Sequence, residues 1–219
     1  MSRDIEEVVG AAFRERTGGG VAPGEFRAWR ESLLQMGRIL HDEGIPDRAG
    51  VAIEYKIPQT NKRIDFIITG LDESRSSKAV IVELKQWSEA RRTKKDGIVL
   101  ARRGGRASEI EGPHPSYQAW SYAALLETFN AAVYEGGIGL RPCAYLHNYE
   151  RDGQIDHPFY APHIQRAPPW TTLHRLRPTR NPLINRGKLF KQTEPLLRPA
   201  VRAARLRPWP ARGGGGPEY

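Results

Sequence analysis

The sequence predicts an α/β sandwich of about 140 residues with the element order α-β-β-β-α-β. Two segments with apolar residues at helical spacing flank three short segments rich in β-branched residues. The second and third of these short segments are apolar on both alternating faces. Since a sheet that is apolar on both faces has to be covered on both sides, we expect helices on each side of a mixed sheet.

The first helix is expected at residues 25–46, after a glycine-rich N-terminal segment, residues 1–24, that we expect to be flexible. Gly44 and Pro46 are signals for the end of this helix. Its apolar residues at helical spacing are Phe26, Trp29, Leu33, Met36 and Leu40. The spacing predicts an amphipathic helix with one face against the sheet.

Three strands are expected next, at residues 51–58, 62–70 and 78–87, and the turn-like segments between them predict an antiparallel meander. Strict alternation assigns their apolar side chains to opposite faces. Ile64, Phe66 and Ile68 would lie on one face of the second strand with Ile67 on the other, and Val80, Val82 and Leu84 on one face of the third with Ile81 on the other.

A second helix is expected at residues 114–137, with Pro115 in its first turn and glycines at its end, followed by a fourth strand at 141–149. These elements define a predicted domain at residues 25–165. From residue 166 the sequence is rich in proline, arginine and glycine, and its periodicity fails. We expect the tail, residues 166–219, to be disordered or to be the product of a shifted reading frame.

The formal net charge of +9 is distributed unevenly along the chain. Residues 1–165 hold 22 lysines and arginines against 23 aspartates and glutamates, whereas the predicted tail holds 12 basic residues against two acidic ones. The basic character of the chain therefore describes the tail and not the predicted domain.

A single cysteine, Cys143, excludes an internal disulfide and a metal cluster built from several cysteines of one chain. The acidic start of the chain lacks the apolar core of a signal peptide, and no apolar run is long enough to span a membrane. We therefore expect a cytoplasmic protein without a membrane partner. Cys143 itself is expected to be an inert thiol of the core.

Three charged residues occupy two very apolar strands, where burial is costly unless each charge has a partner. Asp65 lies near the start of the second strand, and Glu83 and Lys85 lie at the end of the third. In an antiparallel meander the two carboxylates can approach each other, and Glu83 and Lys85 share a face. Two converging carboxylates favour a cation between them, and a neighbouring lysine suits metal-assisted hydrolysis of a phosphodiester. A structural ion-pair network is the alternative.

Asp65 followed by the triplet Glu83-Leu84-Lys85 resembles the signature of the PD-(D/E)xK nuclease superfamily, whose fold is restriction-endonuclease-like. The proline that often precedes the aspartate is replaced by Ile64. The segments "KRIDFIITG", "VIVELKQW", "HPSYQAWSYAALLETFN" and "CAYLHNY" also resemble the N-terminal nuclease-like domain of bacterial Schlafen-like DNA/RNA helicase proteins. This resemblance covers roughly residues 25–165. Where such proteins continue into a helicase domain, the composition of this chain changes, so ATP-driven translocation is not predicted.

The resemblance implies that Asp65 and Glu83 hold Mg²⁺ or Mn²⁺ and that Lys85 assists the attacking water. The carbonyl of Leu84 and the side chain of Glu54 are implied as further metal ligands, with Glu31 a weaker candidate; Glu54 could instead pair with Lys56 or Lys62. Gln118 and Tyr122 fit the Q-x-x-x-Y pattern of RecB-like members. One helical turn apart, they would both face the metal, although an ordinary surface role is the alternative.

Basic residues are frequent between the third strand and the second helix, and they are Arg91, Arg92, Lys94, Lys95, Arg102, Arg103 and Arg106. We consider them candidates for nucleic-acid binding through phosphate contacts, with a solvated charged surface as the alternative. His114 is expected to cap the second helix, and Trp87 to pack in the core or under this segment.

Taken together, these observations predict a Mg²⁺- or Mn²⁺-dependent nuclease that hydrolyses phosphodiester bonds of DNA or RNA, without a small-molecule cofactor. Its expected partners are nucleic acid and, by resemblance, a helicase-type NTPase module. The alternatives are a catalytically inactive nucleic-acid-binding module and a truncated fragment of a nuclease-helicase protein.

Overall fold

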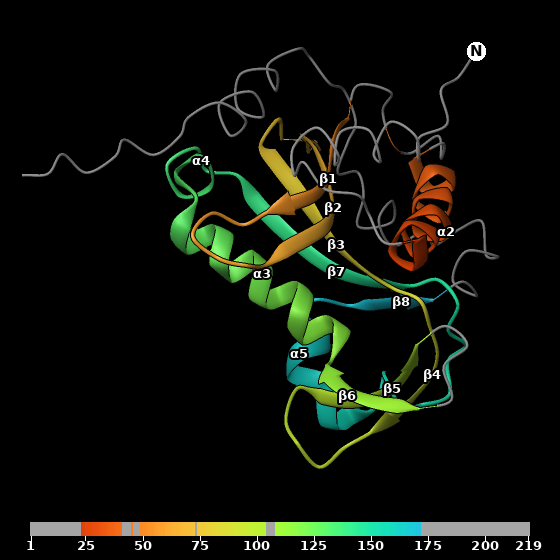
Figure 1. Ribbon diagram of the computed structural model, residues 1–219. Helices are drawn as coiled ribbons and strands as arrows, with labels where there is room; N and C mark the ends of the chain where they lie inside the picture. The colour runs from red at the N-terminus through yellow and green to blue at the C-terminus, as the bar shows by residue number, and fades with distance from the viewer. Residues whose placement is uncertain (1–22, 41–44, 46–48, 73, 104–107, 172–219) are drawn as a thin grey trace, which may run out of the picture.

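The computed structural model describes residues 23–40, 45, 49–72, 74–103 and 108–171 and has a mixed α/β architecture (Figure 1). Its main sheet has five strands in the order β1-β2-β3-β7-β8. The strands are β1 (Gly50–Lys56), β2 (Arg63–Leu71), β3 (Ser77–Lys85), β7 (Gly139–Leu146) and β8 (Pro169–Thr171). The first three strands form an antiparallel meander, whereas β7 and β8 each pair in parallel with their neighbours. The mixed sheet and the predicted meander are therefore confirmed.

Helices cover both faces of this sheet, as its two apolar faces predict. On one face lies α2 (Pro23–Leu40), whose residues Leu33, Met36 and Ile39 pack against Phe66, Val82 and Cys143. On the other face lie α3 (Pro115–Phe129) and α4 (Ala131–Tyr134). Tyr122, Ala123 and Leu126 of α3 pack there against Ile67 and Ile81. The predicted apolar side of the first helix is thus confirmed for the side chains that the structure describes. The side chains of Phe26 and Trp29, and residues 41–44 and 46, lie outside the described part of the chain.

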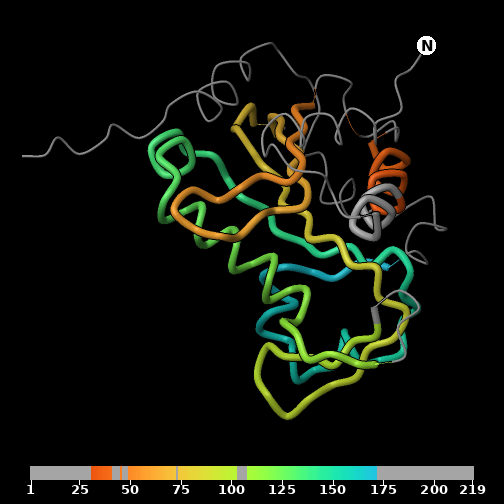
Figure 2. The backbone as a smooth tube through the Cα atoms, in the orientation of Figure 1, coloured from red at the N-terminus to blue at the C-terminus, as the bar shows by residue number. Residues whose placement is uncertain are grey.

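A second, antiparallel sheet of three strands was not predicted. It consists of β4 (Trp87–Arg92), β5 (Ile98–Arg103) and β6 (Glu109–Pro113), in the order β4-β5-β6. It lies in the crossover between β3 and α3, and Figure 2 shows the chain leaving β3, passing through this sheet and returning along α3. Trp87 and Val99 of this sheet are buried with Tyr149 and Tyr160 in a third core cluster, which confirms the buried position of Trp87.

The described fold extends beyond the predicted domain end at residue 165. The short helix α5 (Ala161–Arg166) follows the 3₁₀ turn η1 (Pro158–Tyr160), and β8 then pairs with β7 through Ala144 and Leu146. Ala167 between them is fully buried. The predicted tail boundary at 166 is therefore wrong, because a three-residue strand beside prolines gives no alternation signal. The rest of the tail, from residue 172, and residues 1–22 lie outside the described residues.

Two further boundaries and the face of one residue differ from the prediction. The third predicted strand is divided at Gln86 into β3 and β4. The second predicted helix is divided at Asn130, whose side chain caps α4 by accepting a hydrogen bond from the Ala132 N–H at 3.0 Å. Ile64 lies in the core cluster beneath α3 and not on the face of Phe66. The cause is local: β1 residue Glu54 has φ of 51°, and the register of β1 and β2 has no pair at this position.

None of the helices in the described ranges is long and apolar enough to cross a membrane.

Candidate metal centre

Asp65 and Glu83 lie on neighbouring strands of the main sheet, one residue beyond the paired residues Phe66 and Val82. Asp65 Oδ2 accepts a hydrogen bond from the Leu84 N–H at 2.7 Å. Because odd-numbered residues of β3 face α3, Glu83 and Lys85 both point to the side of the sheet that this helix covers. The antiparallel register thus brings the two predicted carboxylates together, and Leu84 contributes through its N–H.

Lys85 connects this carboxylate pair to α3. Its Nζ donates to Glu83 Oε1 at 2.7 Å and to Gln118 Oε1 at 2.9 Å. Gln118 Nε2 in turn donates to the Tyr122 hydroxyl at 2.8 Å. The helical spacing of Gln118 and Tyr122 therefore orients both toward the site, as their Q-x-x-x-Y pattern predicts. The structure brings together Asp65, Glu83, Lys85 and both helix residues.

Burial controls the protonation of the two carboxyl groups. It raises the pKa of Glu83 to about 8, which the Lys85 charge partly opposes and the Asp65 charge increases. The pKa of Asp65 is also raised, mainly by burial, against the hydrogen bond from the Leu84 N–H and the Lys85 charge. Glu83 is only 2 % exposed, and its Oε2 accepts no hydrogen bond from a fixed donor; without a cation, the Glu83 carboxyl can share a proton with the Asp65 carboxyl beside it. A second cation beside Lys85 would satisfy this oxygen and stabilise both carboxylates.

The donor set fits a small, hard cation. Asp65 and Glu83 offer carboxylate oxygens alone, and Mg²⁺ prefers oxygen ligands and commonly uses one or two carboxylates plus water or phosphate oxygens. Within the described ranges, no group of three or more His, Cys, Asp or Glu residues could hold a metal. The protein's share of the coordination would therefore be these two carboxylates, with the rest supplied by water and substrate.

The additional predicted acids are not part of this group. Glu54 lies opposite Asp65 along β1, but its positive φ accompanies an ion pair between Glu54 Oε2 and Arg63 Nη1 at 3.3 Å. Its partner is thus Arg63 and not Lys56 or Lys62, the residues considered from the sequence. Glu31 lies on α2, across the sheet and near His147; burial lowers the pKa of His147, and the Glu31 charge opposes this effect only in part. Neither carboxylate adds to the pair formed by Asp65 and Glu83.

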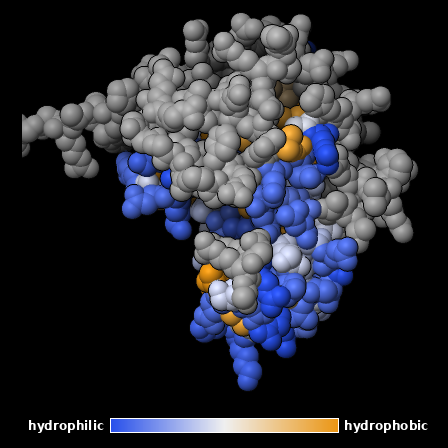
Figure 3. Space-filling model, turned by 45° about the vertical axis from the view of Figure 1, so that its right-hand side comes forward, coloured by the Kyte–Doolittle hydropathy of each residue, from blue (hydrophilic) through white to orange (hydrophobic). Residues whose placement is uncertain are grey.

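The predicted basic segment forms the β4–β6 sheet, and much of its charge is neutralised locally. Figure 3 shows a largely hydrophilic surface over this lower part of the molecule. Ion pairs join Arg91 to Glu109, Lys95 to Glu111 at 2.7 Å and Arg102 to Glu89 at 2.9 Å. Arg92 lies over the Phe159 ring at 5.7 Å, and Lys94 is exposed. The side chain of Arg103 and all of Arg106 lie outside the described part of the chain.

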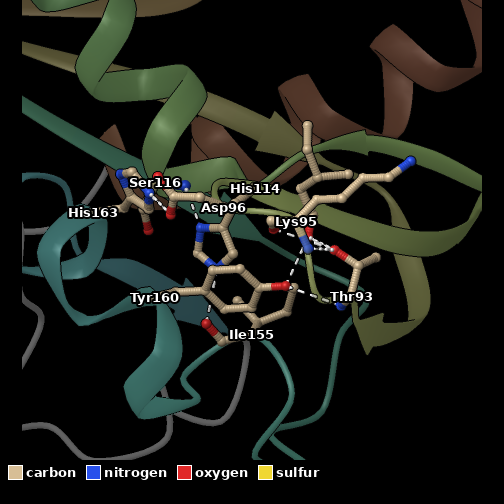
Figure 4. Close-up of polar contacts among 9 residues, drawn as sticks. Thr93, Lys95, Asp96, His114, Ser116, Ile155, Tyr160 and His163 are labelled. Carbon is tan, nitrogen blue, oxygen red and sulfur yellow. Dashed lines mark hydrogen bonds and ion pairs between the residues drawn. The ribbon is translucent and has the colours of Figure 1, made fainter.

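A polar network that the sequence did not reveal fixes the first turn of α3, which carries Gln118 (Figure 4). His114 is fully buried and caps this helix: its Nδ1 accepts from the Ser116 N–H at 3.2 Å, and its Nε2–H donates to the Ile155 carbonyl at 2.8 Å. Burial lowers the pKa of His114 to about 4, so the ring is neutral near pH 7. The predicted capping role of His114 is confirmed.

The same network connects the second sheet to α5. The Tyr160 hydroxyl donates to the Ile98 carbonyl at 2.7 Å and accepts from the Thr93 N–H at 3.2 Å. His163 Nε2 lies 2.9 Å from Asp96 Oδ1. These contacts come from segments more than 60 positions apart, so local sequence patterns could not identify them.

A second network lies on the α2 side of the sheet, next to the end of β3. Gln86 Nε2 donates to Ser32 Oγ at 3.1 Å, and Ser32 Oγ lies 3.1 Å from His147 Nε2. His147 Nδ1 lies 3.0 Å from Asn148 Oδ1. Because Gln86 follows Lys85 directly, this network holds the strand end that carries the lysine, from the face opposite the carboxylates.

Comparison of the chain with protein-family models, with curated proteins and with solved structures gives no significant match.

Proposed function

We propose that this protein is a metal-dependent nuclease that hydrolyses phosphodiester bonds of DNA or RNA with Mg²⁺ or Mn²⁺. The observation that carries the proposal is the convergence of Asp65 and Glu83 from neighbouring strands, with Lys85 joined to Glu83 and to Gln118. The order of strands and helices and these residues resemble the PD-(D/E)xK arrangement. An ordinary ion pair would not require a second buried carboxylate beside it.

The chain's own residues suit this chemistry. Asp65 and Glu83 would hold the cation, which when bound would polarise the phosphate and lower the pKa of a water. Lys85 is placed to orient the attacking water or to neutralise charge that develops on the phosphoryl oxygens. Gln118 accepts from Lys85 and so fixes its ammonium group, while Tyr122 holds the other end of the Gln118 amide.

The protonation of Tyr122 supports a role as a hydrogen-bond donor. Burial, together with the Glu83 charge, raises the pKa of its hydroxyl to about 12. The hydroxyl therefore keeps its proton near neutral pH. It accepts from Gln118 Nε2, so its own proton is available for a phosphate oxygen of the substrate.

The test is cleavage of labelled single- and double-stranded DNA and RNA by the full chain in Mg²⁺, in Mn²⁺ and in EDTA. We expect cleavage that requires the metal and is lost in Lys85→Ala and Asp65→Asn, while the thermal unfolding of both variants remains cooperative. Metal-independent cleavage, or cleavage by both variants at the wild-type rate, would overturn the proposal. Salt-sensitive binding without any cleavage would favour the alternative, a nucleic-acid-binding module.

A further inference from the structure

The hairpin between β1 and β2 holds Lys62 in a fixed position. The Ile57 N–H donates to the Lys62 carbonyl at 3.0 Å, and the Lys62 N–H donates to Thr60 Oγ1 at 3.1 Å. Thr60 Oγ1 donates to the Ile57 carbonyl at 3.0 Å, and Ile57 itself is fully buried beneath α3. The hairpin tip is therefore anchored in the core, and the backbone of Lys62 is fixed on both sides of its Cα.

The side chain of Lys62 extends from this tip to the candidate metal centre. Its Nζ lies over the Tyr122 ring, 5.7 Å from the centroid, within the range of a cation–π interaction. Tyr122 is joined through Gln118 to Lys85. Both lysines are thus connected to Tyr122, Lys62 directly over its ring and Lys85 through the side chain of Gln118.

The ionic surroundings of Lys62 differ from those of the predicted basic segment. Arg91, Lys95 and Arg102 each form an ion pair with a glutamate of the second sheet. Lys62 is exposed and forms no ion pair with any residue that the structure describes. Its ammonium group can therefore bind an anion without first breaking an existing ion pair.

We propose that Lys62 binds a backbone phosphate of the nucleic acid next to the one that lies at Lys85. This inference rests on the proposed function, because it identifies the substrate as a polyanion that extends past the metal centre along the β1–β2 hairpin. A phosphate beside Tyr122 would be held by Lys62 and by the tyrosine hydroxyl. Such a contact is independent of base identity, so Lys62 would set affinity and position without selecting a sequence.

The test measures binding of a fluorescein-labelled oligonucleotide to the full chain in EDTA, at several salt concentrations, for the wild type, Lys62→Ala and Lys62→Arg. Each phosphate contact contributes a slope of about 0.7 to 0.9 to the dependence of log K on log salt. We expect Lys62→Ala to bind several-fold more weakly, with a slope reduced by about that amount. Lys62→Arg, which keeps the charge, should retain wild-type affinity.

The matched control is Lys78→Ala. Lys78 lies at the opposite end of β3 from Lys85 and pairs with Asp72 at 3.3 Å. This variant removes the same net charge and should leave the slope unchanged. An equal loss in both variants would show that only net charge matters, and an unchanged slope in Lys62→Ala would remove the proposed contact; either result overturns the inference.

A second variant separates the position of Lys62 from its charge. Thr60→Val removes the hydroxyl that fixes the Lys62 N–H but keeps the lysine and the size of the side chain. We expect an affinity between those of the wild type and Lys62→Ala. Wild-type affinity in Thr60→Val would show that a fixed backbone at Lys62 is unnecessary and would overturn that part of the inference.

Failure of the inference and failure of the proposed function give different results. If the wild type binds but does not cleave, and Lys62→Ala weakens binding, the phosphate contact stands and the nuclease does not. If the wild type cleaves and Lys62→Ala cleaves with the same KM, the nuclease stands and the contact does not. A wild type that neither binds nor cleaves overturns both.

Discussion

Lys85 Nζ donates a hydrogen bond of 2.7 Å to Glu83 Oε1, across two residues of the same strand. Glu83 is almost completely buried. Lys85 has two further contacts: its Nζ donates to Gln118 and lies 5.5 Å from the Trp87 ring centroid. Since the lysine charge opposes the effect of burial on the carboxyl group, the protonation of Glu83 depends on Lys85.

The first prediction concerns this pair. Lys85→Met keeps most of the side-chain volume but removes the charge, so the pKa of Glu83 should rise above its present value of about 8. Cleavage should fall by about 10²-fold or more, the usual effect of losing a group that acts in proton transfer or charge stabilisation. A ¹³C-carboxyl NMR titration and single-turnover cleavage measure the two effects. Lys78→Met is the control, and a Glu83 pKa that does not move would contradict the coupling.

The second prediction concerns stability and pH without metal. The pKa of Glu83 is about 8 in the folded protein against an ordinary value of 4.5, so between these values the folded state binds a proton that the unfolded state has lost. The free energy of unfolding should therefore decrease as pH rises from about 4.5 to 8, by at most about 1.4 kcal/mol per pH unit for one group. Urea unfolding in EDTA measures this slope. Glu83→Gln should reduce it, and an equal slope in the variant would assign the effect to other groups.

The third prediction concerns the cation itself. Mg²⁺ binds ionised carboxylates and therefore competes with the proton on Glu83 and Asp65. Adding Mg²⁺ should raise the thermal unfolding midpoint more at pH 8 than at pH 6, because folded protein gains the binding free energy. Differential scanning fluorimetry measures the shift without any substrate. Asp65→Asn should lose most of it, whereas a shift that persists in this variant would locate the cation elsewhere.

The β1–β3 meander of the main sheet and the candidate site could be predicted because local sequence patterns specify them. The apolar runs around Asp65 and Glu83 specify two buried strands, and a meander leaves few ways to pair them. Alternation then places Glu83 and Lys85 on one face, and helical spacing places Gln118 and Tyr122 on another element that faces them. These parts need only the two periodicities of strands and helices.

The remaining parts depend on contacts that no local pattern encodes. The strands β4 and β5 each end in two arginines and lie in a segment rich in basic residues. Arg91 and Arg102 therefore suggest a solvated connection from the sequence alone, although their ion pairs with glutamates lie along a sheet. Glu54, a predicted ligand, has a positive φ and forms an ion pair with Arg63. His147 and Ser32 meet across 115 positions, and only the folded chain brings them together.

The fourth prediction concerns the cap of α3. The pKa of His114 is lowered from 6.5 to about 4, so between these values the unfolded state binds a proton that the folded state does not. Stability should therefore be lost as pH falls from about 6.5 to 4, by at most about 1.4 kcal/mol per pH unit. Urea unfolding at several acidic pH values measures the loss. His114→Gln should flatten this dependence, whereas His157→Gln, at the cap of the short η1 turn, should retain it. An acid dependence that survives in His114→Gln would contradict the prediction.

The fifth prediction concerns the network behind Lys85. Ser32→Ala removes the hydrogen bond that Ser32 accepts from Gln86 and the one that it shares with His147, both in a buried or part-buried position. We expect the free energy of unfolding to fall by about 1 to 3 kcal/mol, the cost of losing such bonds inside a protein. Ser121→Ala is the matched control, because among the residues that the structure describes Ser121 bonds only the Gln118 carbonyl of its own helix. Its loss should therefore cost a few tenths of a kcal/mol. Chemical denaturation measures both values. Equal losses would show that the connection between α2 and the end of β3 adds no stability beyond that of a local helix hydrogen bond.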